Sequence, residues 1–262
     1  MNIDLTHKNA LVGAATSGIG AGIATELAKC GASVTLMSRN EEKIKNSLAE
    51  LPVINENQKH QYLVADFSDF ESFKIIIADY FKNNTVDILV NNTNGPEAGT
   101  ALDQNVEDFQ TAFDHLFKTV FETTALALPW MIEKRWGRII NVSSLSVKEP
   151  IPNLVLSNAT RSAVLAWSKS LSNEVAQHQV TINNVLTGNF DTERIQKLIA
   201  IESEQNNISK VEILKAKESK IPMKRLGKPE EYGHLVAFLA SDYAAYLTGT
   251  SIPLDGGLLN VY

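Results

Sequence analysis

Short apolar segments alternate with longer segments whose apolar residues recur at helical spacing, and this alternation runs through the whole chain. Apolar runs of this length between helical segments are typical of strands, whereas the 3.6-residue recurrence predicts helices. We expect seven strands, within residues 9–15, 33–38, 60–67, 86–92, 137–144, 180–188 and 250–257. We expect the main helices within residues 18–31, 40–51, 69–83, 109–136, 156–178 and 228–242.

The expected strands are apolar on both faces and are separated by helices, which favours a parallel sheet covered on both sides. Right-handed crossovers then give an α/β fold, a doubly wound Rossmann sheet of about seven strands, with ligands at the carboxyl ends of the strands. No linker or repeat interrupts the pattern, so we expect one domain over residues 1–262. The charged segment 190–226 follows a strand end, which suits a mobile substrate lid.

Charge and composition exclude several classes of function. The net charge is −6, which argues against nucleic acid or an anionic membrane as the main partner. No apolar run is long enough to span a bilayer, and the N-terminus has no signal-peptide pattern. The five histidines are scattered, so we expect no metal site. A single cysteine, Cys30, fits a reducing cytoplasm and is expected to pack in the core.

A glycine-rich turn, "VGAATSGIG" at residues 12–20, joins the first expected strand to the first expected helix. Glycines there permit a tight turn and a close approach of the backbone to a phosphate, and the amides at the helix start face the anion. A glycine can also simply mark a turn, but the position between strand and helix favours dinucleotide binding. The expected contacts are Gly13, Thr16, Ser17, Gly18, Ile19 and Gly20.

The spacing of this turn resembles that of the short-chain dehydrogenase/reductase family, and the similarity extends over nearly the whole chain. "NNTNG" (91–95), "IINVSS" (139–144), "NNVLTGNFDT" (183–192) and the segment 225–257 are similar to further motifs of that family. The resemblance implies a nicotinamide dinucleotide as cofactor. Its further implied contacts are Asp66 and Phe67 at the adenine, Asn91 and Asn92 on the cofactor strand, and Gly188, Phe190 and Thr192 at the nicotinamide.

The second strand ends in "MSRN", where Ser38 and Arg39 stand and no acid occurs before Glu41. An acid near this point usually binds the free ribose hydroxyls of NAD, whereas a guanidinium can pair with the 2′-phosphate of NADP. We therefore favour NADP(H) over NAD(H). A solvated surface arginine is the alternative interpretation of Arg39.

The family's reaction uses a serine, a tyrosine and a lysine, often with an asparagine. Ser144 fits the serine, with Ser143 as its close competitor, and it polarises the substrate oxygen in this interpretation. The window "LSNATRSAV" (156–164) holds Ser157 and Arg161 at the places of the tyrosine and the lysine. Leu116 falls at the place of the asparagine, beside His115. Arg161 keeps the positive charge at the nicotinamide ribose but cannot shuttle protons.

Two functions remain open on this basis. The chain is a reductase or dehydrogenase of small carbonyl or alcohol substrates with an altered active site, or it is a nucleotide-binding sensor or scaffold on the same fold. An epimerase or dehydratase is the weaker third class. Lys148, on the loop after the serine strand, is the candidate proton donor if it is partly buried; a solvent-facing lysine is the alternative. Family members are commonly dimers or tetramers, so we expect a homo-oligomer joined through the helices at 105–135 and 154–178.

Overall fold

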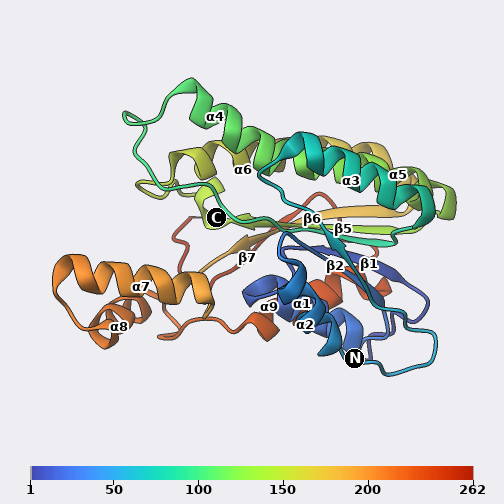
Figure 1. The fold of residues 1–262 in the computed structure, drawn as a ribbon, viewed down its shortest axis with the longest axis horizontal. Coiled ribbons are helices and arrows are strands. Elements are labelled where there is room, and N and C mark those ends of the chain that lie inside the picture. The colour runs from blue at the N-terminus through green and yellow to red at the C-terminus, as the bar shows by residue number, and fades with distance from the viewer. Residues whose placement is uncertain (1, 262) are drawn as a thin grey trace.

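A computed structural model describes residues 2–261, in which seven parallel strands form one sheet (Figure 1). The strand order is β3-β2-β1-β4-β5-β6-β7, so the chain starts in the middle of the sheet and builds outwards on both sides. This confirms the doubly wound parallel sheet expected from the sequence. The strands are β1 Asn9–Gly13, β2 Ser33–Ser38, β3 Gln61–Val64, β4 Ile88–Asn91, β5 Gly137–Ser144, β6 Val180–Thr187 and β7 Ser251–Leu254.

Helices cover both faces of the sheet. Figure 1 shows α1, α2 and α9 on one side and α3, α4, α5 and α6 on the other, while α7 and α8 project from one end. The bounds are α1 Gly18–Lys29, α2 Glu41–Ala49, α3 Phe70–Asn83, α4 Val106–Phe113, α5 Thr119–Lys134, α6 Val155–Val175, α7 Glu193–Asn206, α8 Lys210–Lys220 and α9 Pro229–Ala240.

Two hydrophobic cores, one on each face, follow from the alternation of side chains along a strand. Val12 of β1 packs in the core that holds Ile23 of α1 and Val236 of α9. Its neighbour Leu11 points the other way, into the core that holds Phe73 of α3. Leu11 and Val12 are both fully buried, which is why neighbouring positions of a strand covered on both faces are apolar.

Side-chain caps place several helix starts where the sequence predicts them. Asn40 accepts a hydrogen bond from the backbone of Lys43 at 2.8 Å and begins α2. The expected long helix at 109–136 is interrupted, because α4 and α5 are joined by one π-helical turn at Asp114–Lys118. Such turns carry one extra residue and are frequent at functional sites.

A chain of asparagines crosses the centre of the sheet. The Asn91 side-chain amide donates to Asn141 Oδ1 at 2.9 Å, and Asn141 donates in turn to Asn184 Oδ1 at 2.9 Å. Ser168 of α6 donates to the same oxygen of Asn184 at 3.1 Å. All four residues are buried, and they connect β4, β5, β6 and α6.

The segment 190–226 follows β6 and contains α7 and α8, the two helices that project from the sheet in Figure 1. Phe190 and Gly227 form an isolated bridge at the base of this segment. Within residues 2–261, no helix combines the length and the apolar character needed to cross a membrane.

Candidate functional site

Two cavities open at the carboxyl ends of the strands. The first, of about 830 Å³, is lined by Arg39, Asp66, Phe67 and His115, and we call it the Arg39 cavity. The second, of about 330 Å³, is lined by Ser144, Ser157, Arg161 and Arg194, and we call it the Arg161 cleft. Ala14, Ser17, Asn94 and Gly95 border both. The two are therefore neighbouring parts of one groove that runs along this edge of the sheet.

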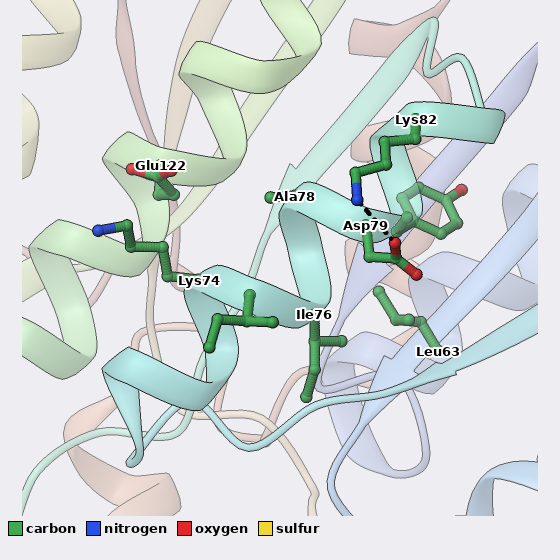
Figure 2. A pocket seen from close by; sticks show the side chains of 9 residues that line it. Leu63, Lys74, Ile76, Ala78, Asp79, Lys82 and Glu122 are labelled. Carbon is green, nitrogen blue, oxygen red and sulfur yellow. Dashed lines mark hydrogen bonds and ion pairs between the residues drawn. The ribbon is translucent and has the colours of Figure 1, made fainter.

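A third hollow lies elsewhere, along α3 (Figure 2). Leu63 of β3, Glu122 of α5 and the α3 residues from Lys74 to Lys82 line it. The residues drawn in Figure 2 are mostly apolar or paired on the surface, as Lys82 is with Asp79 at 3.1 Å. None of them comes from the glycine turn, the end of β5 or the start of α6. The candidate site is therefore the groove formed by the Arg39 cavity and the Arg161 cleft.

The glycine turn leads from β1 into α1 at the point where the two cavities meet. Gly18 has φ +52°, a conformation that glycine adopts without strain. A Cβ on Gly20 would lie 2.1 Å from the carbonyl oxygen of Ala14, so only glycine fits there. Ser17 occupies the N-cap position before α1, but its side chain makes no hydrogen bond to the helix. The first amides of α1 therefore remain available to an anion.

The Arg39 cavity carries charges of both signs. The Arg39 guanidinium, two-thirds exposed, lies 4.0 Å from Asp66 Oδ2. Asp66 Oδ1 accepts hydrogen bonds from the backbone and the hydroxyl of Ser68, at 2.9 and 2.7 Å. The ring of Phe67 packs on Phe73 with centroids 5.4 Å apart. The Asp66 carboxylate is thus held in place by its own turn, and Arg39 is free to contact a ligand.

Two titrating groups face each other across the Arg39 cavity. Burial raises the pKa of the Asp66 carboxyl, but the Ser68 hydrogen bonds and the Arg39 charge outweigh it, and the net shift is downwards. Burial lowers the pKa of His115 below its ordinary value of 6.5, and the charge of Arg161 adds to this against the attraction of Asp66. Asp66 is therefore ionised and His115 neutral at neutral pH.

Ser144, Ser157 and Arg161 come together in the Arg161 cleft, from the end of β5 and the first turns of α6. The Nε of Arg161 donates to Ser157 Oγ at 3.2 Å, and its Nη1 donates to the Val142 carbonyl at 2.8 Å. Ser144 Oγ accepts a hydrogen bond from the Ser146 amide at 3.1 Å, which leaves the hydroxyl proton available to a ligand. The competitor Ser143 also lines the cleft, with a buried hydroxyl that has no partner within residues 2–261.

The Arg161 guanidinium sits in an environment that disfavours its charge. Desolvation lowers its pKa to about 10, helped by the nearby charge of Arg194 and opposed by Tyr232. Even at this value the group stays protonated at neutral pH, so it is a fixed cation.

Lys148 does not reach the cleft. Lys148 is exposed at the end of the short turn Leu145–Val147 and lines neither cavity, so the condition for a proton donor, partial burial, is not met and the alternative of a solvent-facing lysine holds. Leu116 is buried in the π-helical turn, against a void of about 10 Å³ that Ser143 and Arg161 also border. Leu116 therefore places an apolar side chain beside Arg161.

The remaining predicted residues divide between the two cavities. Those that line the Arg39 cavity are Thr16, Ser17, Ser38, Arg39, Asp66 and Phe67. Those that line the Arg161 cleft are Ser17, Gly18, Ile19, Gly20, Asn92, Ser144, Ser157, Arg161, Gly188, Phe190 and Thr192. Gly13 and Asn91 line neither. A Cβ on Gly13 would lie 2.3 Å from the Asn92 carbonyl oxygen, and Asn91 belongs to the asparagine chain, so both are explained by packing.

Three residues near the groove were given no role in the sequence analysis. His115 lines the Arg39 cavity. Arg194, in the first turn of α7, reaches Gly95, where a Cβ would lie 2.8 Å from its Nη1. The Tyr232 hydroxyl of α9 lies 3.0 Å from Thr187 Oγ1 at the wall of the cleft. Among residues 2–261, no group of three or more histidine, cysteine, aspartate or glutamate side chains is placed to hold a metal ion.

Known proteins are similar to this chain in sequence and in fold. Residues 13–259 match a family model described as enoyl-(acyl carrier protein) reductase. The 3-oxoacyl-(acyl-carrier-protein) reductase FabG of Rickettsia conorii is 36% identical over 259 residues, which cover 99% of this chain and 100% of that protein.

Solved structures agree with these sequence matches. The crystal structure of YwfH, an NADPH-dependent reductase involved in bacilysin biosynthesis, superposes with a TM-score of 0.89 at 30% identity, over 97% of this chain and 99% of that one. A 3-oxoacyl (acyl-carrier-protein) reductase from Agrobacterium tumefaciens with NADP bound has a TM-score of 0.86 at 27% identity, over 98% of this chain and 96% of that one. The chain therefore belongs to the short-chain dehydrogenase/reductase family.

Proposed function

We propose that this protein is an NADPH-dependent reductase of small carbonyl compounds, or the reverse alcohol dehydrogenase, with Ser157 and Arg161 at the places where the family has tyrosine and lysine. The observation that carries the proposal is the cluster of Ser144, Ser157 and Arg161 in a cleft bordered by the glycine turn. A reductase needs a cofactor groove and a polarising hydroxyl side by side, and the two cavities supply both.

The groove fits a dinucleotide. The uncapped amides at the start of α1 suit a diphosphate, and the closely packed Gly20 lets the backbone approach it. Arg39 and Lys43 both line the Arg39 cavity, where they would pair with a 2′-phosphate. Two of the solved relatives are described with NADPH or NADP, which supports NADP(H) over NAD(H).

In the proposed reaction the bound cofactor supplies or accepts the hydride. Ser144 donates a hydrogen bond from its free hydroxyl to the substrate oxygen and so stabilises the negative charge that develops there. Arg161, held by Val142 and Ser157, keeps three further N–H donors for the cofactor ribose and the substrate. Its fixed charge orients these groups but passes on no proton.

The proton that completes the alcohol comes from water in this proposal. The residues that line the Arg161 cleft include no tyrosine, lysine or histidine. Ser157 is a much weaker acid than a phenol, and its oxygen accepts the hydrogen bond from Arg161 Nε. Loss of a positioned general acid typically costs a factor of about 10²–10⁴, so we expect slow turnover.

The test is NADPH oxidation against a panel of ketones, quinones and 3-oxoacyl thioesters. We expect activity on at least one class, falling by about 10²-fold in Ser144→Ala and in Arg161→Ala, because each removes a donor to the developing charge. Lys148→Ala, outside the cleft, is the matched control and should keep its activity. Tight NADPH binding without turnover on any compound would contradict the reductase and support the sensor or scaffold.

A gain-of-function variant tests the assignment of the two replaced positions. Ser157→Tyr with Arg161→Lys restores the side chains that the family uses at these places. We expect faster turnover than in the native protein, with a pH profile that reports the new phenol. A double variant that binds NADPH normally but gains nothing would show that these positions do not correspond to the family's pair.

We also infer a homo-oligomer joined through α4, α5 and α6. Phe113 and Phe117 stack, Trp167 of α6 meets Phe117 edge-on, and Phe121 beside them is 45% exposed. Apolar aromatic surface of this kind is typical of subunit interfaces. Sedimentation should show a dimer or tetramer that Phe121→Glu dissociates; a native monomer would contradict the inference.

The segment 190–226 is proposed as the substrate lid, supported by its position after β6 and by the residues Phe190, Thr192 and Arg194 that it contributes to the cleft. A cytoplasmic location is part of the same proposal, and its support is the lone Cys30, which fits a reducing compartment.

A further inference from the structure

Two arginines face the same small cleft, and neither is paired with an acid. Arg161 projects from α6 and Arg194 from the first turn of α7, and both line the Arg161 cleft. Their charges are close enough for Arg194 to contribute to the lowered pKa of Arg161. Among residues 2–261, no carboxylate oxygen lies within 4.0 Å of a nitrogen of either arginine, although Glu193 is part of the cleft wall.

Each guanidinium has N–H donors without a partner. Arg161 uses its Nε and Nη1 within the protein, and three of its five N–H groups have no partner among the described residues. Arg194 lines the cleft beside Gly95, where a Cβ would lie 2.8 Å from its Nη1 and 3.1 Å from its Nη2, and it makes no hydrogen bond to residues 2–261. A guanidinium presents paired donors that match the two oxygens of a carboxylate.

We propose that Arg161 and Arg194 together bind a carboxylate of the substrate, so that the natural substrate is an oxo acid whose carbonyl reaches Ser144. This rests on the proposed reductase function and adds the substrate class. Bringing two like charges into one cleft is unfavourable unless an anion joins them, and a substrate carboxylate provides the missing charge.

The cofactor is the other source of an anion, and it fits less well. Its diphosphate already has the uncapped amides of α1 at the glycine turn. The redox end of the cofactor carries no negative charge: the nicotinamide ring is neutral when reduced and positive when oxidised. Two guanidinium groups beside Ser144 and Ser157 are therefore better complemented by the substrate.

The experiment measures binding and needs no turnover. The full-length protein, saturated with NADP⁺ so that no hydride is available, is titrated in a calorimeter with short α-oxo and β-oxo acids and with their methyl esters. The esters keep the carbonyl and lose the negative charge. We expect at least one acid to bind about tenfold or more tightly than its ester, because a charge-assisted pair has this strength.

Variants then assign the preference to Arg194. Arg194→Ala should abolish the preference for acid over ester, whereas Lys197→Ala, which removes an equal charge one turn further along α7 and outside the cleft, should leave it unchanged. Arg194→Lys should keep part of it, because the charge remains but the paired donors are lost.

Three results would overturn the proposal. One is equal affinity for acids and esters, or no binding of any acid by a protein that binds NADP⁺. Another is a preference that survives Arg194→Ala. The third is that Arg194→Ala weakens NADP⁺ binding while the acid preference stays, which would assign the guanidinium to the cofactor diphosphate. Failure of the native protein to bind NADP⁺ would instead contradict the proposed function itself, and the cofactor titration measures this first.

Discussion

The Arg39 cavity and the Arg161 cleft lie at the same edge of the sheet, but their charges are arranged differently. In the Arg39 cavity the cation Arg39 has Asp66 within 4.0 Å, and the carboxylate is held by Ser68. In the Arg161 cleft two guanidinium groups face the same space and neither has an acid within that distance. In the Arg39 cavity the cation already has a carboxylate nearby, whereas in the Arg161 cleft the two cations need an anion from a ligand.

The difference predicts how strongly the loss of a single side chain affects each region. Binding in the Arg39 cavity relies on exposed side chains such as Arg39, so we expect single side-chain losses there to weaken binding without ending it. Chemistry in the Arg161 cleft relies on a few side chains fixed by hydrogen bonds, and each of them has a distinct role. The following predictions test this contrast, beginning with the backbone that both regions share.

The largest effect is expected at Gly20. In Gly20→Ala the new Cβ would lie 2.1 Å from the Ala14 carbonyl oxygen, so the turn must move. We expect NADPH affinity to fall by about 100-fold, because the amides no longer meet the diphosphate in register. The free energy of unfolding should fall by about 1–3 kcal/mol. Calorimetry and urea unfolding measure the two quantities.

Gly95→Ala is the matched control for the loss of stability at Gly20. Its Cβ would meet the end of the Arg194 side chain, which can move away, so the free energy of unfolding should change little. Equal losses in the two variants would show that the effect at Gly20 is not specific to the turn.

A smaller effect is expected at Arg39. Arg39→Ala should lower NADPH affinity about tenfold and leave NADH affinity unchanged, because an exposed guanidinium pairs only with the 2′-phosphate. Lys45→Ala, in α2 and paired with Glu41 at 2.7 Å, is the control. Equal losses for both dinucleotides would remove Arg39 from the recognition of the phosphate.

The smallest effect concerns pH and His115. Its pKa in the folded protein lies below the ordinary 6.5, chiefly because the ring is buried, so the unfolded chain binds more protons in this range. Stability should therefore fall as the pH drops below about 6.5, by less than about 1.4 kcal/mol per pH unit for this one group. His115→Gln should flatten that slope in urea unfolding between pH 5.5 and 7.5.

A comparison with Glu231 isolates this slope. The ion pair with Arg225 lowers the pKa of Glu231 from 4.5 to about 2, so its contribution is lost only at more acidic pH. A slope unaffected by His115→Gln would mean that His115 is protonated equally in both states.

Local signals in the sequence predicted most of the fold and the cofactor end of the groove. The strands are apolar because both faces are buried, and Asn40 and the glycine turn act through residues next to them in the chain. The sequence analysis missed features that are formed by residues far apart in the chain. Arg194 reaches Gly95 from nearly a hundred residues away, and Tyr232 was simply an apolar position of α9.

The loop after β5 shows why a residue near the site in sequence can be outside it in space. Ser144 caps the short turn that follows, and Lys148 leaves that turn towards solvent. Neither the direction of the turn nor the exposure of Lys148 is encoded by spacing alone. The roles of Ser144, Ser157 and Arg161 stay predictions, although the structure does bring the three residues together.

The asparagine chain beneath the cleft has a consequence for how the two cavities stay aligned. Asn91, Asn141 and Asn184 must face one another across three strands to share their amide hydrogen bonds. Sliding any one of these strands by a residue would turn its amide to the opposite face and leave buried polar atoms unpaired. The asparagine chain therefore fixes the register of the three strands. It keeps the end of β4, where the dinucleotide would lie, level with the end of β5, where Ser144 would meet the substrate.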